Sequence, residues 1–368
     1  MRKILAGLLI TTMALGLVAC GSAPAPAAAP AAAPAASEAA PAAEAAAPAE
    51  AAAPAEADLT QGDALTIRVG HAFTDKSSYH ISLEEYFKKP IEEKTGGRIT
   101  VELYPSAQLG GERELLESTG MGSIEMSLVN GANIANIDPN YMVFDFPFLF
   151  DSADAAYAAC DGEVGDLLKQ SIQEYGYYCL GLGTVGYRQI SNSVRPITSP
   201  DDLKGIKLRT METPIQLAIW NTLGANPTPM AMNELFTAMQ QKTVDGQENP
   251  PSLIYDQKFY EVNNYISMTG HVYHALGYMC NKDWFDGLSD ADKALIAECA
   301  NTAANEQRRL IREQDEEDLK LMEEKGVQVN YLTDEQLAVF REATASVYEE
   351  FKPQLAEGLV EKAQSYNK

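Results

Sequence analysis

The chain has 368 residues and a formal net charge of −24, and 46 % of its residues are hydrophobic. This length suggests two domains, and the hydrophobic share is ordinary for a globular protein. Two basic residues near the start and four glutamates before residue 58 leave a charge of −22 on residues 58–368. So acidic a body argues against nucleic acid as a partner, and against docking on anionic lipid through a basic patch.

The first 19 residues have the pattern of a lipoprotein signal peptide. Arg2 and Lys3 precede an apolar run, residues 4–18, which is short for a transmembrane helix of about 20 residues. The run ends in Leu-Val-Ala before Cys20. This order resembles the lipobox of bacterial lipoproteins, in which the cysteine becomes the lipid-bearing first residue. We therefore expect residues 1–19 to be removed and Cys20 to anchor the protein to the outer face of the cell membrane.

A linker follows the expected lipid anchor. Residues 20–57 are almost entirely Ala, Pro and Glu, and seven prolines prevent a long helix. Such a composition cannot form a core, and a fully extended chain of this length reaches on the order of 100 Å at ~3.1 Å per residue. We interpret the segment as a spacer between the membrane and a folded body that begins near residue 58.

Strands and helices alternate along the body. The patterns predict strands at residues 65–69, 98–103, 124–129, 177–182 and 206–209. They predict helices at residues 81–94, 112–119, 214–223 and 233–241, and one helical turn after Ser199. Pro90 should kink the first helix, and Gly96 should end it. Strands separated by helices indicate an α/β fold with largely parallel sheets.

The longest predicted helix begins after Ser289, an N-cap residue followed by Asp290 and Asp292. No Gly or Pro interrupts the chain from there to about Glu324. More than thirty helical residues span ~50 Å at 1.5 Å per residue. Because this exceeds one small domain, the simplest compact arrangement lays the helix across two lobes. A last helix is expected from Thr333 toward the C-terminus.

Four cysteines remain in the body: Cys160, Cys179, Cys280 and Cys299. Export permits disulfides, and four cysteines allow three pairings, among which the sequence does not choose. The chain has no CxxC pair, so zinc and thioredoxin-like sites are weakly supported. Isolated cysteines are more commonly small buried hydrophobic residues.

Motifs for catalysis or metal binding are weak. Residues Gly181–Gly186 match GxGxxG after a strand, but the polar, Pro-terminated residues 187–196 lack the helical period of a dinucleotide site. His271 and His274 could be two metal ligands, yet no acid nearby in the sequence suits a third. No GxSxG motif occurs. We therefore expect no cofactor, no metal and no enzymatic activity.

Several stretches carry a family resemblance. They are TGGRITVELYPSAQLG (95–110), FPFLF (146–150), GYRQI (186–190), LKGIKLR (203–209), LGANPTPM (223–230), NEL (233–235) and VDGQENP (244–250). In order and spacing they resemble the extracytoplasmic solute-binding proteins of tripartite ATP-independent periplasmic (TRAP) transporters, the DctP family. The resemblance covers residues 65–368.

The resemblance implies a periplasmic binding protein-like fold, with two α/β lobes joined by a hinge and one long helix spanning both. The chain should cross between lobes near residues 184–186 and 274–276. Lobe I is then residues 58–185 and 275–315, and lobe II is residues 186–274 and 316–368. Ligand would close the cleft between the lobes by hinge bending.

The resemblance also nominates three principal ligand residues. In the family, the arginine of the Lys-Leu-Arg stretch forms a two-point salt bridge with the ligand carboxylate, and here it is Arg209. A guanidinium group matches a carboxylate bidentately, which lysine cannot do. Arg188 of Gly-Tyr-Arg-Gln is expected as a second cation near the ligand. Asn249 of Glu-Asn-Pro is expected to bond the ligand or orient the main arginine.

Other lining residues are expected at strand ends, which usually line such a cleft: His71, Phe73, Asn130 and Asn133. The family's lining positions add Met232, Glu248 and His271. Family members that bind sialic acid carry an arginine at the position of Asn133 and an acid at that of Asn130. Neutral amides at both positions favour a smaller hydroxylated acid, such as a uronate or aldonate.

The resemblance thus predicts a monomeric, extracytoplasmic, lipid-anchored receptor. It would capture a carboxylate solute and deliver it to the membrane subunits of a TRAP transporter. A four-carbon dicarboxylate or an oxo-acid is the alternative ligand. A sensory binding protein and a secreted enzyme that reuses the scaffold are the alternative functions.

Overall fold

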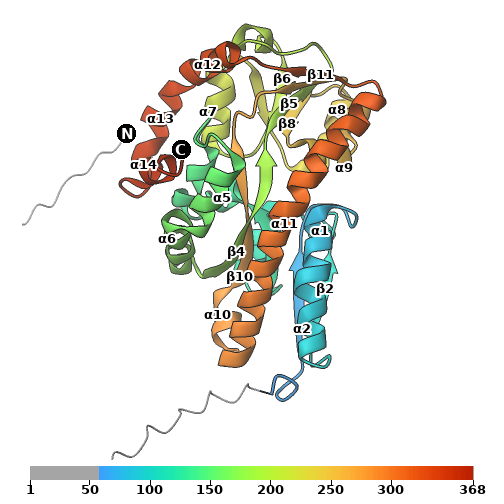
Figure 1. The fold of residues 1–368 in the computed structure, drawn as a ribbon, viewed down its shortest axis with the longest axis vertical. Coiled ribbons are helices and arrows are strands. Elements are labelled where there is room, and N and C mark those ends of the chain that lie inside the picture. The colour runs from blue at the N-terminus through green and yellow to red at the C-terminus, as the bar shows by residue number, and fades with distance from the viewer. Residues whose placement is uncertain (1–57, 368) are drawn as a thin grey trace, which may run out of the picture. The chain divides into compact units, whose positions relative to one another are not determined.

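A computed structural model describes residues 58–367. The predicted signal peptide (residues 1–19), Cys20 and the linker to residue 57 lie outside the described residues. The described part contains two β-sheets, each packed with helices (Figure 1). The predicted α/β fold with two lobes is confirmed.

The first sheet has the strand order β2-β1-β3-β10-β4. Its strands are β1 (Leu65–Gly70), β2 (Ile99–Tyr104), β3 (Met126–Asn130), β4 (Tyr177–Tyr187) and β10 (Tyr273–Asn281). β1 pairs in parallel with β2 and β3, whereas β10 runs antiparallel to both of its neighbours.

The second sheet has the strand order β11-β9-β5-β8-β6-β7. Its strands are β5 (Gln189–Asn192), β6 (Lys207–Thr210), β7 (Asn226–Pro229), β8 (Gly246–Asn249), β9 (Tyr265–Met268) and β11 (Gln328–Tyr331). Here β5 is antiparallel to β8 and β9, and the other pairs are parallel. Each sheet is therefore mixed, because the strand that arrives directly from the other sheet runs against the rest.

The two sheets are joined by a pair of crossing segments. β4 passes into β5 through Arg188 alone, and β9 passes into β10 through residues 269–272. The segments run antiparallel: Tyr187 pairs with Tyr273, and the Arg188 N–H donates to the Val272 carbonyl at 2.9 Å. This pair is the structural candidate for the hinge, and the predicted lobe boundaries stay a prediction.

The glycines of the GxGxxG stretch serve packing and chain path. A Cβ atom on Gly181 would lie 2.9 Å from the Cβ of Ala304, so glycine lets the long helix approach β4 closely. Gly186 has a φ of +115°, and a Cβ there would lie 3.0 Å from the Cγ of Pro250. Both positions therefore need glycine for reasons unrelated to phosphate binding.

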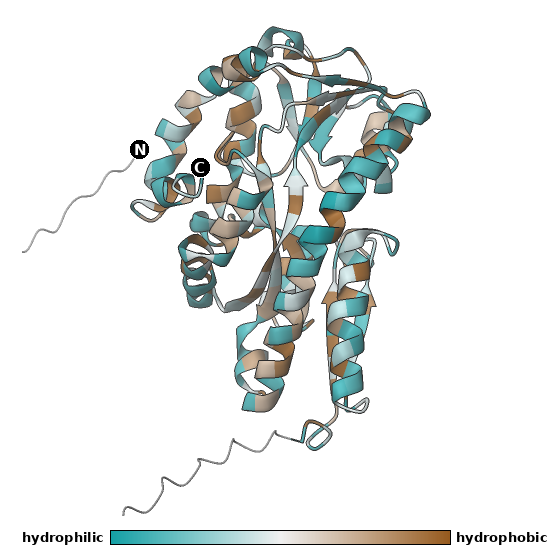
Figure 2. Ribbon diagram, viewed as in Figure 1, coloured by the Kyte–Doolittle hydropathy of each residue, from teal (hydrophilic) through white to brown (hydrophobic). Residues whose placement is uncertain are grey.

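The predicted long helix is α11 (Asp290–Glu324), with 35 residues. The Ser289 hydroxyl caps it by accepting the Asp292 N–H at 3.1 Å. α11 packs against β4 and α1 (Ser78–Leu83) of one lobe and α9 (Pro251–Asp256) of the other, and Figure 1 shows it passing the strands of both sheets. Its buried positions include Ile296 and Ile311, and Figure 2 shows apolar residues interspersed with polar ones along the helix.

The first predicted helix, which contains Pro90, is divided into three segments and is not simply kinked. The segment consists of α1 (Ser78–Leu83), a π-helix (Glu84–Lys88) and α2 (Lys89–Lys94). Proline has no N–H and its ring crowds the carbonyl four residues earlier. The wider π-turn lies directly before the proline and makes room for this ring.

The other helices follow the predicted alternation. They are α3 (Glu112–Gly120), α4 (Gly131–Ile134), α5 (Ala153–Asp161), α6 (Glu163–Ser171), α7 (Pro214–Thr222), α8 (Met232–Gln240), α9 (Pro251–Asp256) and α10 (Lys282–Asp286). Short 3₁₀ helices lie at Pro139–Asp145, Ile172–Tyr175, Pro200–Leu203, Phe259–Glu261 and Lys352–Gln354.

The last predicted helix is divided into α12 (Asp334–Ala343), α13 (Ala345–Phe351) and α14 (Leu359–Gln364). Pro353 and Gly358, which has a φ of +76°, lie between the last two helices and stop a continuous helix. α14 packs on α6 and on the 3₁₀ helix Pro139–Asp145. These contacts join the end of the chain to helices that pack on the first sheet, and the predicted extent of lobe II, residues 186–274 and 316–368, stays a prediction.

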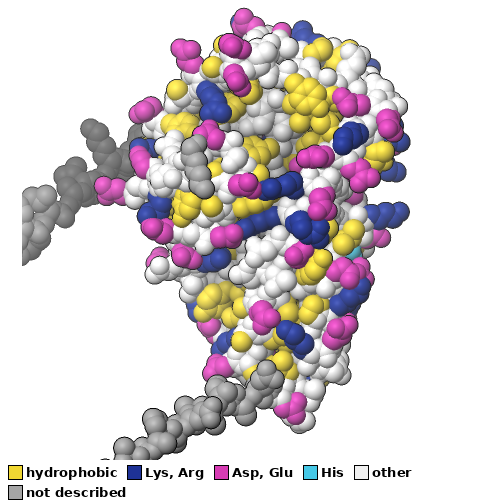
Figure 3. Space-filling view, viewed as in Figure 1, with side chains coloured by type: hydrophobic (Ala, Val, Ile, Leu, Met, Phe, Trp, Pro, Cys, Tyr) yellow, Lys and Arg dark blue, Asp and Glu magenta, His cyan; other side chains and the backbone are white. Residues whose placement is uncertain are grey.

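The surface matches the acidic composition. Figure 3 shows acidic and basic side chains interspersed over the face in view. Within residues 58–367, no helix has both the length and the apolar character needed to cross a membrane.

Candidate ligand-binding site

A small cavity lies where elements of both lobes meet. Its walls come from the ends of strands and the starts of helices: Phe73, Glu112, Asn130, Val185, Arg188, Arg209, Met211, Met232, Asn249 and Leu253. The cavity volume is about 10 Å³, close to the least that one water molecule needs. The side chains are thus packed almost shut around two arginines.

Arg209 on β6 is the cation of this cavity that lacks an ion pair. Its side chain donates from Nε and Nη2 to the Met230 carbonyl, at 3.0 and 2.8 Å. The residue is only 4 % exposed, and no carboxylate among residues 58–367 lies within 4.0 Å of its guanidinium. Burial lowers the pKa of Arg209 to about 10, and the charge of Arg188 adds to this effect, whereas the charges of Glu248, Glu112 and Glu212 oppose it. Arg209 stays charged at neutral pH, so an anionic oxygen would be a favourable partner.

Arg188, by contrast, is already paired. Its Nη2 donates to Glu248 Oε1 at 2.8 Å, and its Nε donates to Glu248 Oε2. Both residues are buried. Burial opposes ionisation of Glu248, but the charge of Arg188 and the nearby His271 ring hold its pKa well below the usual range. Arg188 lines the cavity, yet Glu248, which does not line it, neutralises its charge.

Glu248 and His271 form a layer behind Arg188 and do not line the cavity. His271 Nε2 lies 3.4 Å from Glu248 Oε2, and its Nδ1 lies 2.8 Å from the Thr269 hydroxyl. Its ring packs edge-on against Trp220, with 4.9 Å between centroids. Burial lowers the pKa of His271, although Glu248 opposes this shift. The geometry favours a supporting role for both predicted residues over direct contact with a solute.

Glu112 is the charged lining residue that the sequence analysis missed, and the apolar lining residues Val185, Met211 and Leu253 were missed as well. Glu112 begins α3 and accepts the Asn130 backbone N–H at 2.8 Å and the Asn133 Nδ2–H at 3.0 Å. Burial raises the pKa of Glu112, while the charges of Arg209 and Arg188 oppose the rise. The strand-end rule that nominated Phe73 and Asn130 also applies after β2, and it would have drawn attention to this helix start.

The predicted neutral residues divide between the cavity and its surroundings. Asn130, Asn249, Phe73 and Met232 line the cavity, and Asn133 lines an adjoining hollow with Glu112 and Arg209. The Asn249 amide donates to Gln247 Oε1 at 2.5 Å, and within residues 58–367 no hydrogen bond joins its side chain to Arg209. The Phe73 ring stacks on Tyr79, with 3.8 Å between centroids.

His71 was predicted to line the ligand cleft, but it does not line the cavity at Arg209. It is fully buried, and its Nε2 lies 3.0 Å from His80 Nδ1, outside the set of cavity-lining residues. Burial lowers the pKa of His71 to about 3, and the neighbouring His80 adds to the effect. The His71 ring is therefore neutral and acts in packing beside Phe73.

Comparison with known proteins decides the family. Residues 69–354 match the model of the bacterial extracellular solute-binding proteins, family 7 (DctP). The chain belongs to this family. The periplasmic protein YiaO of Escherichia coli, which binds 2,3-diketo-L-gulonate, is 34 % identical over 76 % of this chain and 84 % of that protein.

Solved structures of the family show the same fold. The sugar acid binding protein DctPAm of Advenella mimigardefordensis, in complex with galactonate, is 35 % identical with a TM-score of 0.80; the match covers 83 % of this chain and 99 % of that one. A TRAP periplasmic solute-binding protein of Sulfurospirillum deleyianum with bound succinate is 28 % identical with a TM-score of 0.79; here 83 % and 100 % are covered. These relatives are binding proteins.

The two histidines singled out by sequence serve separate networks in this solute-binding protein. His271 contacts Thr269 and Glu248, whereas His274 contacts Asp145. In the part of the chain that the structure describes, no group of three or more His, Cys, Asp or Glu could hold a metal ion.

All four body cysteines are free and buried: Cys160, Cys179, Cys280 and Cys299. Burial raises the pKa of the Cys160 thiol to about 12. These thiols are therefore unreactive core residues, and none of the three possible pairings is formed.

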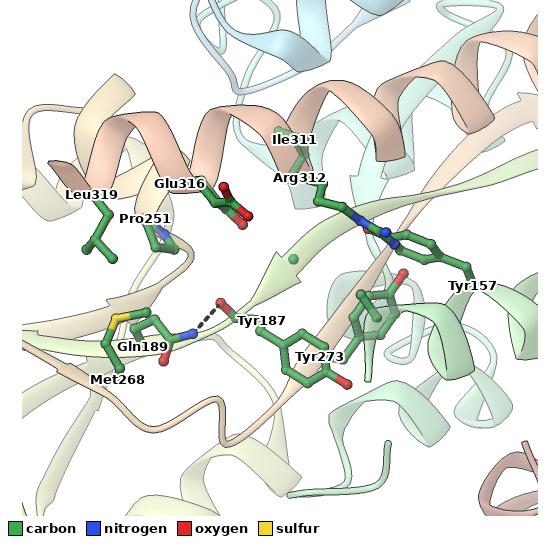
Figure 4. Close-up of a pocket in the computed structure, with 13 residues that line it drawn as sticks. Tyr157, Tyr187, Gln189, Pro251, Met268, Tyr273, Ile311, Arg312, Glu316 and Leu319 are labelled. Atoms are coloured by element: carbon green, nitrogen blue, oxygen red, sulfur yellow. Dashed lines mark hydrogen bonds between the residues drawn. The ribbon is translucent and has the colours of Figure 1, made fainter. Parts of the chain in front are cut away.

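A second cavity, of about 240 Å³, lies on the α11 side of the crossing strands (Figure 4). Figure 4 shows Arg312 reaching from α11 to the ring of Tyr157, where its guanidinium lies 5.3 Å from the ring centroid. Arg312 also pairs with Asp154 at 2.5 Å. Because this cation already has a carboxylate, the cavity at Arg209 is the stronger anion site.

The ion pair behind the cavity gives a stability prediction. Glu248→Gln leaves Arg188 buried without a carboxylate, and we expect the free energy of unfolding to fall by about 3–5 kcal/mol at pH 7. The folded-state pKa of Glu248 is below that of the unfolded chain. Its contribution is therefore present above about pH 4.3 and is lost as the pH falls toward the folded pKa.

Urea denaturation at pH 7 and pH 3 checks this prediction. The difference in the free energy of unfolding between the wild-type protein and Glu248→Gln should be smaller at pH 3 than at pH 7. Glu117→Gln, an exposed change on α3, should cost less than about 0.5 kcal/mol at both values. A difference that does not depend on pH would contradict the proposed role of the Glu248 charge.

Proposed function

We propose that this protein captures a sugar acid, such as an aldonate or a uronate, between its lobes and delivers it to the membrane subunits of a TRAP transporter. The observation that carries this proposal is Arg209, a buried cation with only a backbone carbonyl as partner. A solute carboxylate would supply the missing charge through two charge-assisted hydrogen bonds. Galactonate in DctPAm and diketogulonate in YiaO support the class of ligand.

Glu112 favours a sugar acid over a dicarboxylate. Its carboxylate borders the same cavity as Arg209, and Asn130 and Asn133 hold it in place. A hydroxyl group of a sugar acid can donate to Glu112, whereas a second carboxylate there would repel it. A four-carbon dicarboxylate or an oxo-acid remains the alternative ligand, and the succinate complex of a relative is the observation in its favour.

Binding requires the lobes to separate. The cavity of about 10 Å³ is far smaller than any sugar acid, so a solute enters only when the walls move apart. Arg188 and residues 269–272, where the crossing strands change sheet, are placed to act as the hinge. We propose that the solute binds the open form and that Arg209 and Glu112 close around it.

The cellular setting is proposed from the N-terminal sequence and the family. We propose that Cys20 carries lipid, that residues 20–57 are a spacer, and that the monomeric body works outside the cytoplasm. A sensory partner is the alternative, and a permease encoded beside this gene would argue against it. An enzyme on the same scaffold is a further alternative, and turnover of the bound solute would favour it.

Arg209 provides the central test of this function. Arg209→Lys keeps the charge but loses the bidentate geometry, and we expect galactonate affinity to fall at least tenfold, or ~1.4 kcal/mol. Arg209→Ala should cost more, because the solute carboxylate would then be buried without a partner. Isothermal titration calorimetry measures both, after a thermal-shift screen of sugar acids, dicarboxylates and oxo-acids identifies the best ligand.

Two controls make the Arg209 test decisive. Arg309→Lys, a change at an exposed arginine on α11, should bind like the wild type. Melting curves without ligand should be similar for Arg209→Lys and the wild type. Wild-type affinity in Arg209→Lys would make Arg188 the better candidate, and a far lower melting temperature would mean that Arg209 is structural.

Glu112 gives a separate prediction about selectivity. Glu112→Gln removes the negative charge and should weaken galactonate binding by about tenfold or more, since a hydrogen bond to a charged group contributes roughly 1.5–3 kcal/mol. Succinate binding should weaken less or improve, because the repulsion is removed. Calorimetry with both acids gives the ratio of affinities, and Glu117→Gln on the same helix should leave it unchanged. An unchanged ratio in Glu112→Gln would count against the sugar-acid proposal.

The lipid anchor is tested by Cys20→Ala. This variant should be released from membranes or remain unprocessed, because no sulfur is left to carry lipid. Cell fractionation and intact-protein mass spectrometry measure the two outcomes. Cys299→Ala, which changes a buried cysteine of the body, should stay membrane-bound. Normal processing and full retention of Cys20→Ala would disprove the anchor.

A further inference from the structure

A buried hydrogen-bond network leads from the cavity to helices of both lobes. Asn130, which lines the cavity, places its Nδ2 atom 3.1 Å from His274 Nδ1. His274 Nε2 lies 2.7 Å from Asp145 Oδ1, and Gln216 Nε2 on α7 donates to the same oxygen at 2.9 Å. Asn130 is 4 % exposed and the other three residues are fully buried.

The Ala132 backbone N–H shows how the Asn130 amide is oriented and, through it, which nitrogen of His274 carries the proton. The Ala132 N–H donates to Asn130 Oδ1 at 2.9 Å, and a backbone N–H can only donate. The oxygen of the Asn130 amide therefore faces Ala132, and the nitrogen faces His274. His274 Nδ1 must then accept, which leaves the ring proton on Nε2, directed at Asp145.

The surroundings keep the His274 ring neutral. Burial lowers the pKa of His274, and the charge of Arg188 adds to the effect, while Asp145 opposes it. A neutral ring has one donor and one acceptor nitrogen, and the network uses both. His274 is thus joined to Asn130 by one nitrogen and to Asp145 by the other.

We propose that His274 is a positioning residue for solute binding, because its Nδ1 lone pair, together with the Ala132 N–H, holds the Asn130 amide in one orientation toward the solute. This inference rests on the proposed function. An amide offers a hydrogen-bond donor at one end and an acceptor at the other. Epimeric sugar acids direct their hydroxyl groups differently, so each epimer requires the donor and the acceptor at different positions. Fixing the amide therefore contributes to the choice among such acids. Asp145 and Gln216 hold the ring from the other side.

Two substitutions separate the two nitrogens of His274. An asparagine side chain can place its oxygen near the Nδ1 position, whereas a glutamine side chain can place its amide near Nε2. His274→Asn should therefore keep the partner of Asn130 and bind galactonate within about threefold of the wild type. His274→Gln should keep the partner of Asp145 but bind at least tenfold more weakly. Melting temperatures without ligand should show the opposite order, with His274→Asn the less stable.

A merely structural histidine predicts a different pattern. Both variants would then lose affinity in step with their melting temperatures, and this result would overturn the proposal. A double variant supplies a second criterion. If His274 acts through Asn130, adding His274→Gln to Asn130→Ala should cause no further loss of affinity. Additive losses would also overturn the proposal.

A measurement without ligand separates this inference from the proposed function. Long-range ¹H–¹⁵N spectra of the histidine rings in the wild-type protein should show His274 protonated on Nε2 and not on Nδ1. A proton on Nδ1 would overturn the positioning role whatever the protein binds. If the expected tautomer is found but no sugar acid binds, the proposed ligand class fails while the network stands.

Discussion

The site depends on one physical constraint, a buried guanidinium without a carboxylate. Arg209 is nearly inaccessible to water, and its polar contacts go to the Met230 carbonyl. A buried charge that is not neutralised is costly, and a protein keeps one when its function requires it. The surrounding carboxylates do not remove the constraint: Glu248 is paired with Arg188, and Glu112 accepts hydrogen bonds from Asn130 and Asn133 without an ion pair to Arg209. An acidic solute that pairs with Arg209 would resolve it.

Arg188 shows why geometry was needed to separate two similar motifs. Both arginines lie within sequence stretches that resemble the family, and both line the same cavity. Only the structure shows that Glu248 accepts two hydrogen bonds from the Arg188 side chain, with His271 behind it. Removing the partner of such a buried pair is strongly destabilising, so this arginine is tied to the stability of the lobe. Arg209 is the cation that remains available to a solute.

Local patterns in the sequence predicted the long helix and part of the remaining helices and strands. The long helix was predicted from its Ser289 cap and the absence of Gly and Pro up to Glu324, because these are local properties of the chain. Strand ends predicted Phe73 and Asn130 as lining residues for the same reason. The π-turn before Pro90 was not predicted, since proline indicates a disruption but not which wider turn accommodates it.

Contacts between distant segments could not be predicted from local patterns. Glu112 meets Asn130 and Asn133 only after α3 packs beside β3. His274 was considered only as a metal ligand, because its partners Asp145 and Gln216 are far away in the sequence. The reversed direction of β5 and β10 likewise follows from how the chain crosses between sheets, which no single strand encodes.

The neutral amides around Arg209 make selectivity a question of orientation. A charged side chain has one electrostatic preference, whereas an asparagine offers a donor or an acceptor according to how its neighbours hold it. Ala132 and His274 hold Asn130, Gln247 holds Asn249, and Glu112 holds Asn133. Several of these neighbours do not line the cavity themselves. A substitution behind the cavity can therefore change which hydroxyls are accepted while every lining residue stays the same. Relatives that share this fold bind acids as different as galactonate and succinate.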